Sequence, residues 1–68
     1  MNFTIELDRE EDGRWIAEVL ELPGVLTYGQ TREDAIAKVQ ALAFHVIADR
    51  IEHGELNEPF VSVSFAAA

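Results

Sequence analysis

Three segments of the chain show the strict or near-strict alternation that is typical of β-strands. Phe3–Leu7 places three large apolar residues on one face and two polar residues on the other, as in a half-buried strand. Trp15–Leu22 is largely apolar on both faces, which favours an interior strand. The polar segment Asp8–Arg14 contains a glycine, so the first two strands are predicted to form a hairpin. Phe60–Phe65 alternates again and predicts the last strand.

Between the second strand and the next long pattern, the chain carries turn residues. Pro23 lacks the N–H that a central strand uses, so it ends the second strand. Pro23 followed by Gly24 is also the preferred centre of a type II turn. Val25–Tyr28 then predicts a short third strand, with Leu26 and Tyr28 expected on its core face.

The remaining long pattern is helical, because its apolar residues recur every three or four positions. Thr31 is expected to cap the start of this helix, and Asp34, three residues later, resembles the acid of a capping box. The helix is expected to run to about His53, with Gly54 just beyond its end. A helix of this length spans about 34 Å, so its last turns should project beyond a small sheet.

The predicted fold is a single α+β domain over residues 1–65, with the order β-β-β-α-β and a frayed tail at 66–68. The first three strands form an antiparallel meander, and a right-handed crossover places the fourth strand parallel to the first. The expected sheet order is therefore 3-2-1-4, with one long helix on one face. The uncovered face is expected to carry Thr4, Glu6, Ile16, Glu18, Leu20, Phe60, Ser62 and Ser64.

The chain has 68 residues and no cysteine, so neither size nor disulfides give it much stability. Small domains of this kind are often stabilised by association, and we expect a homo-oligomer. Phe44 and Ile51 lie outside the apolar stripe of the helix, where either a curved sheet or a subunit or partner interface would cover them. The unpaired edge of the third strand could add a strand from another subunit. The candidate interface residues are Phe44, Ile51, Val25, Leu26, Thr27 and Tyr28.

The formal net charge is −8, from 13 acidic and five scattered basic residues. This charge repels nucleic acids and anionic membranes, so we expect neither as a direct partner. A basic protein partner fits the charge, although solubility alone would also account for it. The N-terminus does not have the pattern of a signal peptide, and a cytoplasmic protein is expected.

Residues that could perform chemistry are few and scattered. His45 and His53 are separated by about 80° around the helix, which does not favour a shared metal. Ser62 and Ser64 have no neighbouring base in the sequence, and the acidic turn between Asp8 and Asp12 lacks the spacing of a calcium loop. Glu6 and Glu18 are expected to be ordinary exposed carboxylates. We therefore predict no catalytic residues, cofactor or metal, and no enzymatic activity.

One stretch, DGRWIAEVLELPGVLTYGQTREDAIAKVQAL, resembles the core signature of the HicB-like antitoxin family and covers about half of the chain. That signature comprises a Gly-aromatic hairpin, an Ala-Glu strand, a PELPG turn, a short strand, GxT and a helix opened by EEA. The sequence departs from it at Leu20, Val25 and Asp34, where Pro, Cys and Glu are common. The matching positions are Gly13, Trp15, Ala17, Glu21, Leu22, Pro23, Gly24, Gly29, Thr31, Glu33 and Ala35.

The resemblance implies a truncated RNase H-like fold and a non-enzymatic protein that binds and masks a small basic mRNA-interferase toxin. Family members often continue into a DNA-binding ribbon-helix-helix or helix-turn-helix segment, which these 68 residues do not include. The alternative is an orphan HicB-like domain of unassigned role, which assembles into oligomers without a toxin partner.

Overall fold

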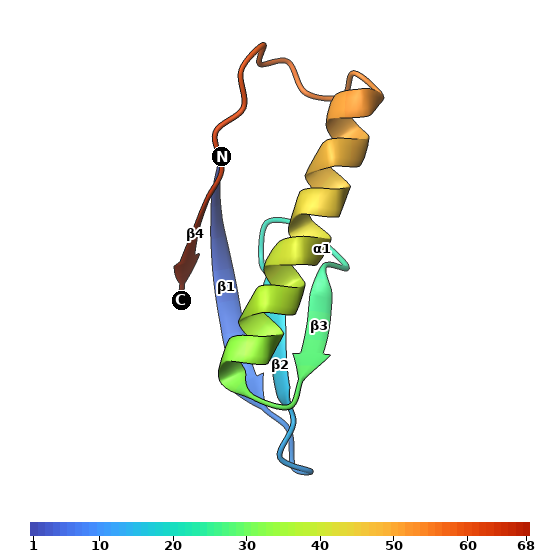
Figure 1. Cartoon of the computed structure of the whole chain (residues 1–68). Coiled ribbons are helices and arrows are strands. Elements are labelled where there is room, and N and C mark those ends of the chain that lie inside the picture. Colours follow the sequence, from blue (N-terminus) through green and yellow to red (C-terminus); the bar gives the residue numbers. More distant parts are fainter.

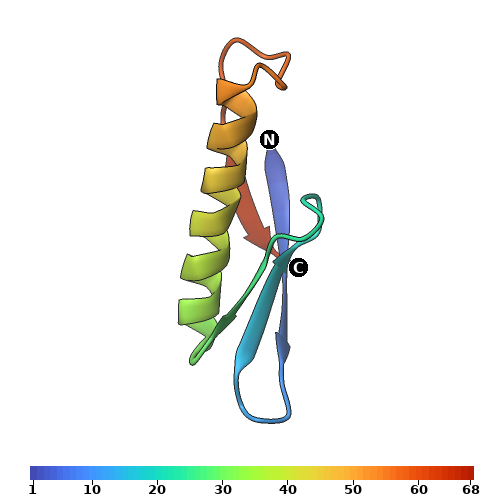
Figure 2. The same cartoon turned by 90° about the vertical axis from the view of Figure 1, so that its right-hand side faces the viewer.

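The computed structural model describes all 68 residues and contains four strands and one helix (Figure 1). The strands form one sheet in the order β3-β2-β1-β4, and α1 lies across one face of it (Figure 2). β1 is antiparallel to β2 and parallel to β4, as the sequence predicts. The bounds are Asn2–Arg9 for β1, Trp15–Val19 for β2, Leu26–Gly29 for β3, Arg32–Glu52 for α1 and Ser64–Ala67 for β4.

The core lies between the sheet and α1. Alternate residues of β1 and β2 point toward the helix, and every fourth or third residue of α1 points back at them. Three of the buried residues are alanines with no exposed surface, which lets the helix backbone lie close to the sheet. The buried residues are Phe3, Ile5, Ala17, Val19, Leu22, Val25, Ala35, Val39, Ala43 and Ile47.

Both ends of α1 match the sequence prediction. The Thr31 hydroxyl accepts a hydrogen bond from the Asp34 N–H at 3.0 Å, while the Asp34 carboxylate accepts one from the Gln30 N–H at 3.2 Å. This is a capping box in which the acid reaches one residue further back than usual. At the other end Gly54 has a φ of 67°, and the Glu55 N–H donates to the Arg50 carbonyl at 2.9 Å. This Schellman arrangement ends the helix beyond the edge of the sheet (Figure 1).

The Pro-Gly turn forms as predicted, but the strand after it has the opposite orientation. The Val25 N–H donates to the Leu22 carbonyl at 3.0 Å, and Gly24 has a φ of 84°, as in a type II turn. Val25 is buried, so alternation turns Leu26 and Tyr28 to the face away from the helix. The prediction that these two side chains contribute to the core was wrong.

The reason is the close approach of α1 to β3. A Cβ on Gly29 would lie 2.8 Å from the Cα of Ala35 and 3.0 Å from the carbonyl carbon of Asp34. The Thr27 hydroxyl, on the same side of β3, donates to the Ala35 carbonyl at 3.1 Å. Only small side chains fit on this side, so the large side chains of β3 must lie on the other.

The last strand begins four residues later than predicted. Because α1 ends beyond the sheet, the chain needs residues 54–63 to return to the start of β1, and pairing begins only where Ser64 lies opposite Asn2 (Figure 1). Ala66 and Ala67 pair with Thr4 and Ile5 and are not frayed. Phe60 therefore lies in the connecting loop and not in a strand.

At the open end of the β1–β2 hairpin, a side-chain carboxylate replaces a backbone oxygen as the acceptor of one interstrand hydrogen bond. The Leu20 N–H donates to the Thr4 carbonyl at 3.0 Å, but the Thr4 N–H donates to the Glu21 carboxylate at 2.7 Å instead of to a backbone oxygen. The Thr4 hydroxyl donates to the same carboxylate at 2.8 Å. These two hydrogen bonds, the backbone one first, hold the pKa of Glu21 below its ordinary value of 4.5.

Because folding lowers the pKa of Glu21, we predict that the free energy of unfolding depends on pH. A pKa that is lowered by folding stabilises the folded state above pH 4.5, and that contribution is lost as the pH falls through the folded-state pKa. In urea titrations between pH 6 and pH 2.5, we expect Glu21→Gln to lose less stability on acidification than the wild type. Glu58→Gln, in an exposed loop, is the control and should keep the wild-type slope. Equal slopes for Glu21→Gln and the wild type would contradict the assignment.

Candidate functional site

The sheet face opposite α1 is uncovered along its length (Figure 2). The strand register places its side chains in rows that cross the sheet. Glu6 lies beside Glu18 and Glu18 beside Leu26, while Asp8 lies beside Ile16 and Ile16 beside Tyr28. We call this surface the open face; its residues are Thr4, Glu6, Asp8, Ile16, Glu18, Leu20, Leu26 and Tyr28.

The open face is divided into an acidic part and an apolar part. The acidic residues lie on β1 and near the end of β2, whereas the apolar residues lie toward β3. Leu20, Leu26 and Tyr28 are each between 40% and 48% exposed. None of the open-face residues is basic. The nearest cation is Arg14, whose guanidinium lies 4.6 Å from the centre of the Tyr28 ring.

Arg14 is not free to neutralise the acidic part, because it is held by its own turn. Its Nε lies 2.7 Å from a carboxylate oxygen of Asp12, and its backbone N–H donates to the other oxygen at 3.1 Å. These contacts, the backbone hydrogen bond first, lower the pKa of Asp12. Arg14 therefore forms a cation–π contact with Tyr28 at the edge of the open face and does not reach its acidic part.

The predicted interface residues fall on two separate surfaces. Leu26 and Tyr28 lie on the open face, whereas Phe44 and Ile51, 52% and 48% exposed, lie on the helix side of the sheet. Val25 is only 4% exposed and belongs to the core, so its side chain does not contribute to a surface. The Thr27 side chain is half-buried and donates a hydrogen bond to α1, so Thr27 could contribute to an interface only as part of the edge strand β3.

Phe44 is partly covered by the last strand. Its ring meets Phe65 of β4 edge-on with ring centres 5.5 Å apart, and Phe65 in turn lies 5.7 Å from Phe3. The sheet thus reaches Phe44 from one side, as the curved-sheet alternative predicts. Phe44 and Ile51 nevertheless remain about half exposed.

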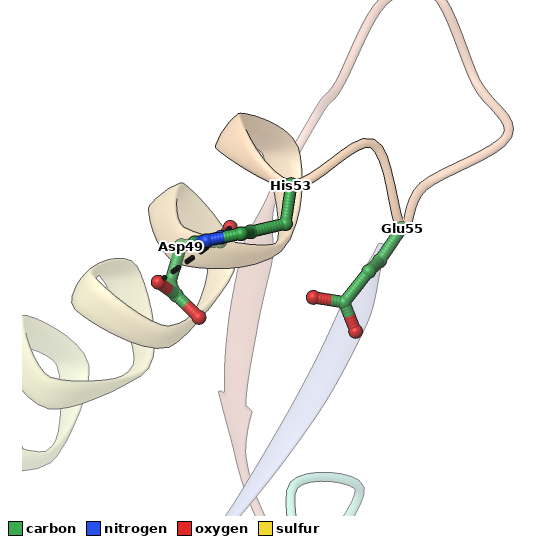
Figure 3. A group of neighbouring side chains, drawn as sticks. All are labelled: Asp49, His53 and Glu55. Carbon is green, nitrogen blue, oxygen red and sulfur yellow. Dashed lines mark hydrogen bonds and ion pairs between the residues drawn. The ribbon is translucent and has the colours of Figure 1, made fainter.

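A group of polar side chains that the sequence did not indicate gathers at the end of α1. Asp49, His53 and Glu55 bring possible metal-ligand atoms within 4.8 Å of one another (Figure 3). The spacing of Asp49 and His53 suits one helix face, but Glu55 joins them only because the Schellman turn folds the chain back. All three are fully on the surface, and His53 Nδ1 already lies 2.7 Å from the Asp49 carbonyl oxygen. Such a group could hold a divalent cation only weakly.

The other residues considered for chemistry are engaged locally or isolated. The Ser64 hydroxyl donates to the Asn2 side-chain oxygen at 2.6 Å, and Ser62 is exposed in the loop before β4. Glu6 and Glu18 are cross-strand neighbours on the open face, as predicted. The surface has no pocket. What the arrangement offers is an acidic and apolar sheet face without a pocket, which is suited to contact with another macromolecule.

The one helix of the structure does not have the length and apolar composition needed to cross a membrane.

Comparison with known proteins gives one informative similarity. The chain is 29% identical over 55 residues to UPF0150 protein Ta0767 of Thermoplasma acidophilum, and the alignment spans 81% of this chain and 80% of that protein. No family model matches the sequence, and no solved structure matches it. The chain is thus similar over most of its length to a protein of comparable size.

Proposed function

We propose that this protein is a HicB-like antitoxin-type protein, without enzymatic activity, that binds and masks a small basic mRNA-interferase toxin. The observation that carries the proposal is the open face, which is acidic and apolar and has no basic side chain among the residues that form it. The motif resemblance described above and the similarity to a UPF0150 protein support a family of small domains, and the β-β-β-α-β order is compatible with a truncated RNase H-like fold. Because the toxin would act on mRNA, the complex would work in the cytoplasm.

The two parts of the open face have different roles in this proposal. Glu6, Asp8 and Glu18 attract a basic partner and orient it during encounter. Leu20, Leu26 and Tyr28 provide the apolar contact that gives the complex its lifetime, with the aromatic residue as the principal anchor. Because the face is a strand surface without a projecting loop or a pocket, it would act by covering the RNA-binding surface of the toxin rather than by inserting a group into it.

The test is relief of toxicity by co-expression. The toxin to use is the small basic protein with a lone catalytic histidine that a neighbouring reading frame would encode. We expect the wild-type chain to restore growth and the double variant Glu6→Lys with Glu18→Lys to lose this protection. The two substituted residues are cross-strand neighbours, so a like-charge pair is kept and the fold should survive.

The matched control is Glu52→Lys with Glu58→Lys, which changes the net charge equally but lies away from the open face. This control should protect like the wild type. Equal loss of protection in both double variants would show that net charge matters and the open face does not. If the wild-type chain fails to relieve toxicity, the antitoxin proposal itself is wrong.

A second candidate function is favoured by the exposure of Phe44 and by the free edges of the sheet. In this alternative the chain is an orphan HicB-like domain whose main property is assembly into oligomers. It predicts that the wild-type chain self-associates, that no adjacent frame encodes a basic toxin, and that the open-face variants behave like the wild type.

A further inference from the structure

A second apolar stripe follows α1 on the side that faces away from the core. Its members are separated by four, three, four and three residues, which is the spacing of a helix–helix contact seam. All are exposed, and none carries a charge. We call it the outer stripe; it consists of Ala37, Ala41, Phe44, Ala48 and Ile51.

The outer stripe continues into β4. Phe44, at its centre, touches Phe65 of β4, so the two surfaces adjoin. β4 is the end strand of the sheet, and no strand covers its outer side (Figure 1). The Ser64 and Ala68 N–H groups donate to the Met1 and Ile5 carbonyls, so alternation directs the backbone groups of Phe65 and Ala67 away from the sheet.

Of the features that protect natural edge strands from pairing, β4 has only its short length of four residues. Charged side chains and prolines normally prevent edge strands from pairing with other chains. Phe60–Ala68 has no charged side chain and no proline, and Phe60 is 89% exposed. The edge of β3 differs, because that strand runs directly into the charged first turn of α1, Arg32–Asp34. An uncharged and unpaired edge is open to pairing with another chain.

The net charge of the protein indicates which partner fits the surface formed by the outer stripe and β4. Two copies with a net charge of −8 each repel one another, and only contact through an uncharged surface keeps their carboxylates apart. The outer stripe and β4 form such a surface, whereas the open face would place acidic residues against acidic residues. A basic partner, in contrast, would gain nothing electrostatically from this uncharged side.

We propose that two copies of this chain associate β4 to β4, antiparallel around a twofold axis, so that one continuous sheet runs through both. The exposed backbone groups of Phe65 and Ala67 pair across the axis, and the Phe44 and Phe65 rings of each copy lie close to the axis on the helix side of the joined sheet. Both open faces remain uncovered on the opposite side of the joined sheet. The dimer does not depend on the proposed function, since it uses a different surface and no toxin.

The experiment measures mass by sedimentation equilibrium over a range of protein concentrations, with circular dichroism as the check of folding. The wild type should have twice the mass of the 7.6 kDa chain. Phe44→Glu places a carboxylate on both sides of the axis, and we expect association to weaken by roughly 30-fold or more. Ala67→Pro removes a donor of the free edge and keeps the hydrogen bonds to β1, so it should also yield monomers.

Two matched variants test the choice of surface. Leu20→Glu adds a carboxylate at a similarly exposed residue of the open face, and Leu26→Pro removes an edge donor from β3. Both should remain dimers. A wild type that is monomeric at all concentrations overturns the proposal. The proposal is also overturned if Phe44→Glu and Ala67→Pro are folded and still form dimers. It is likewise overturned if Leu26→Pro or Leu20→Glu dissociates the dimer.

Discussion

Gly29→Ala is expected to remove most of the stability of the protein at 25 °C. The added Cβ would lie 2.8 Å from the Cα of Ala35 and still closer to its nitrogen, and both belong to backbone that cannot rotate away. Either β3 must separate from β2 or α1 must move off the sheet, and both loosen the core. We expect a loss of about 3 kcal/mol in the free energy of unfolding, measured by urea titration.

The control for this prediction is Gly24→Ala. Gly24 has a φ of 84°, but a Cβ there would meet nothing within 4 Å, so only backbone strain opposes the change. Its cost should be about 1 kcal/mol. If the two variants are equally stable, the close approach of α1 to β3 does not exist in solution, and neither does the reason given for the orientation of Leu26 and Tyr28.

Leu22→Ala is expected to have the second largest effect. Leu22 is 2% exposed although it lies between strands, at the first position of the Pro-Gly turn. Truncating a buried leucine leaves a cavity and costs about 2–4 kcal/mol. A domain of this size has about 3–5 kcal/mol of stability in total, so the variant should be close to its unfolding midpoint without denaturant. Thermal and urea unfolding at one fixed protein concentration provide the measurement.

Leu20→Ala serves as the neighbouring comparison. Leu20 is two residues away but 48% exposed on the open face, and its truncation should cost less than about 1 kcal/mol. Equal destabilisation by the two substitutions would mean that the loop does not bury Leu22 as described. The pair also separates stability from binding, because Leu20 and not Leu22 is available to a partner.

The two proposed surfaces lie on opposite sides of the sheet, and this has a consequence for function. Association through β4 would leave both open faces accessible, so one dimer could bind two basic partners. Phe44→Glu is then expected to change mass without removing protection in the co-expression assay. Glu6→Lys with Glu18→Lys should do the reverse.

Local sequence patterns were sufficient for the elements and their order. Alternation placed β1 and β2, the Pro-Gly pair placed the turn at Leu22–Val25, and Thr31 and Gly54 marked the ends of α1. The sheet order followed from short connections and one right-handed crossover. Each of these features depends on residues close together in the chain. Their conformational preferences can be inferred from the sequence without knowledge of the tertiary structure.

The candidate surfaces were harder to predict, because they depend on how elements meet. Alternation in β3 fixes only that Leu26 and Tyr28 share a face; the approach of α1 to Gly29 decides which face it is. The start of β4 depends on how far α1 projects, since pairing must wait for the chain to return to Asn2. The meeting of Asp49 with Glu55 likewise depends on the turn that ends the helix.

By itself, the sequence determined the α+β class, the strand order and the caps of the helix, because these depend on hydrophobic period, turn residues and hydrogen bonds over a few positions. Only the tertiary structure decided which side chains are left for partners. It turned Leu26 and Tyr28 outward, buried Val25 and brought Phe65 against Phe44. The physical reason is that exposure depends on close packing between distant segments, and at Gly29 there is room for a hydrogen atom and nothing larger.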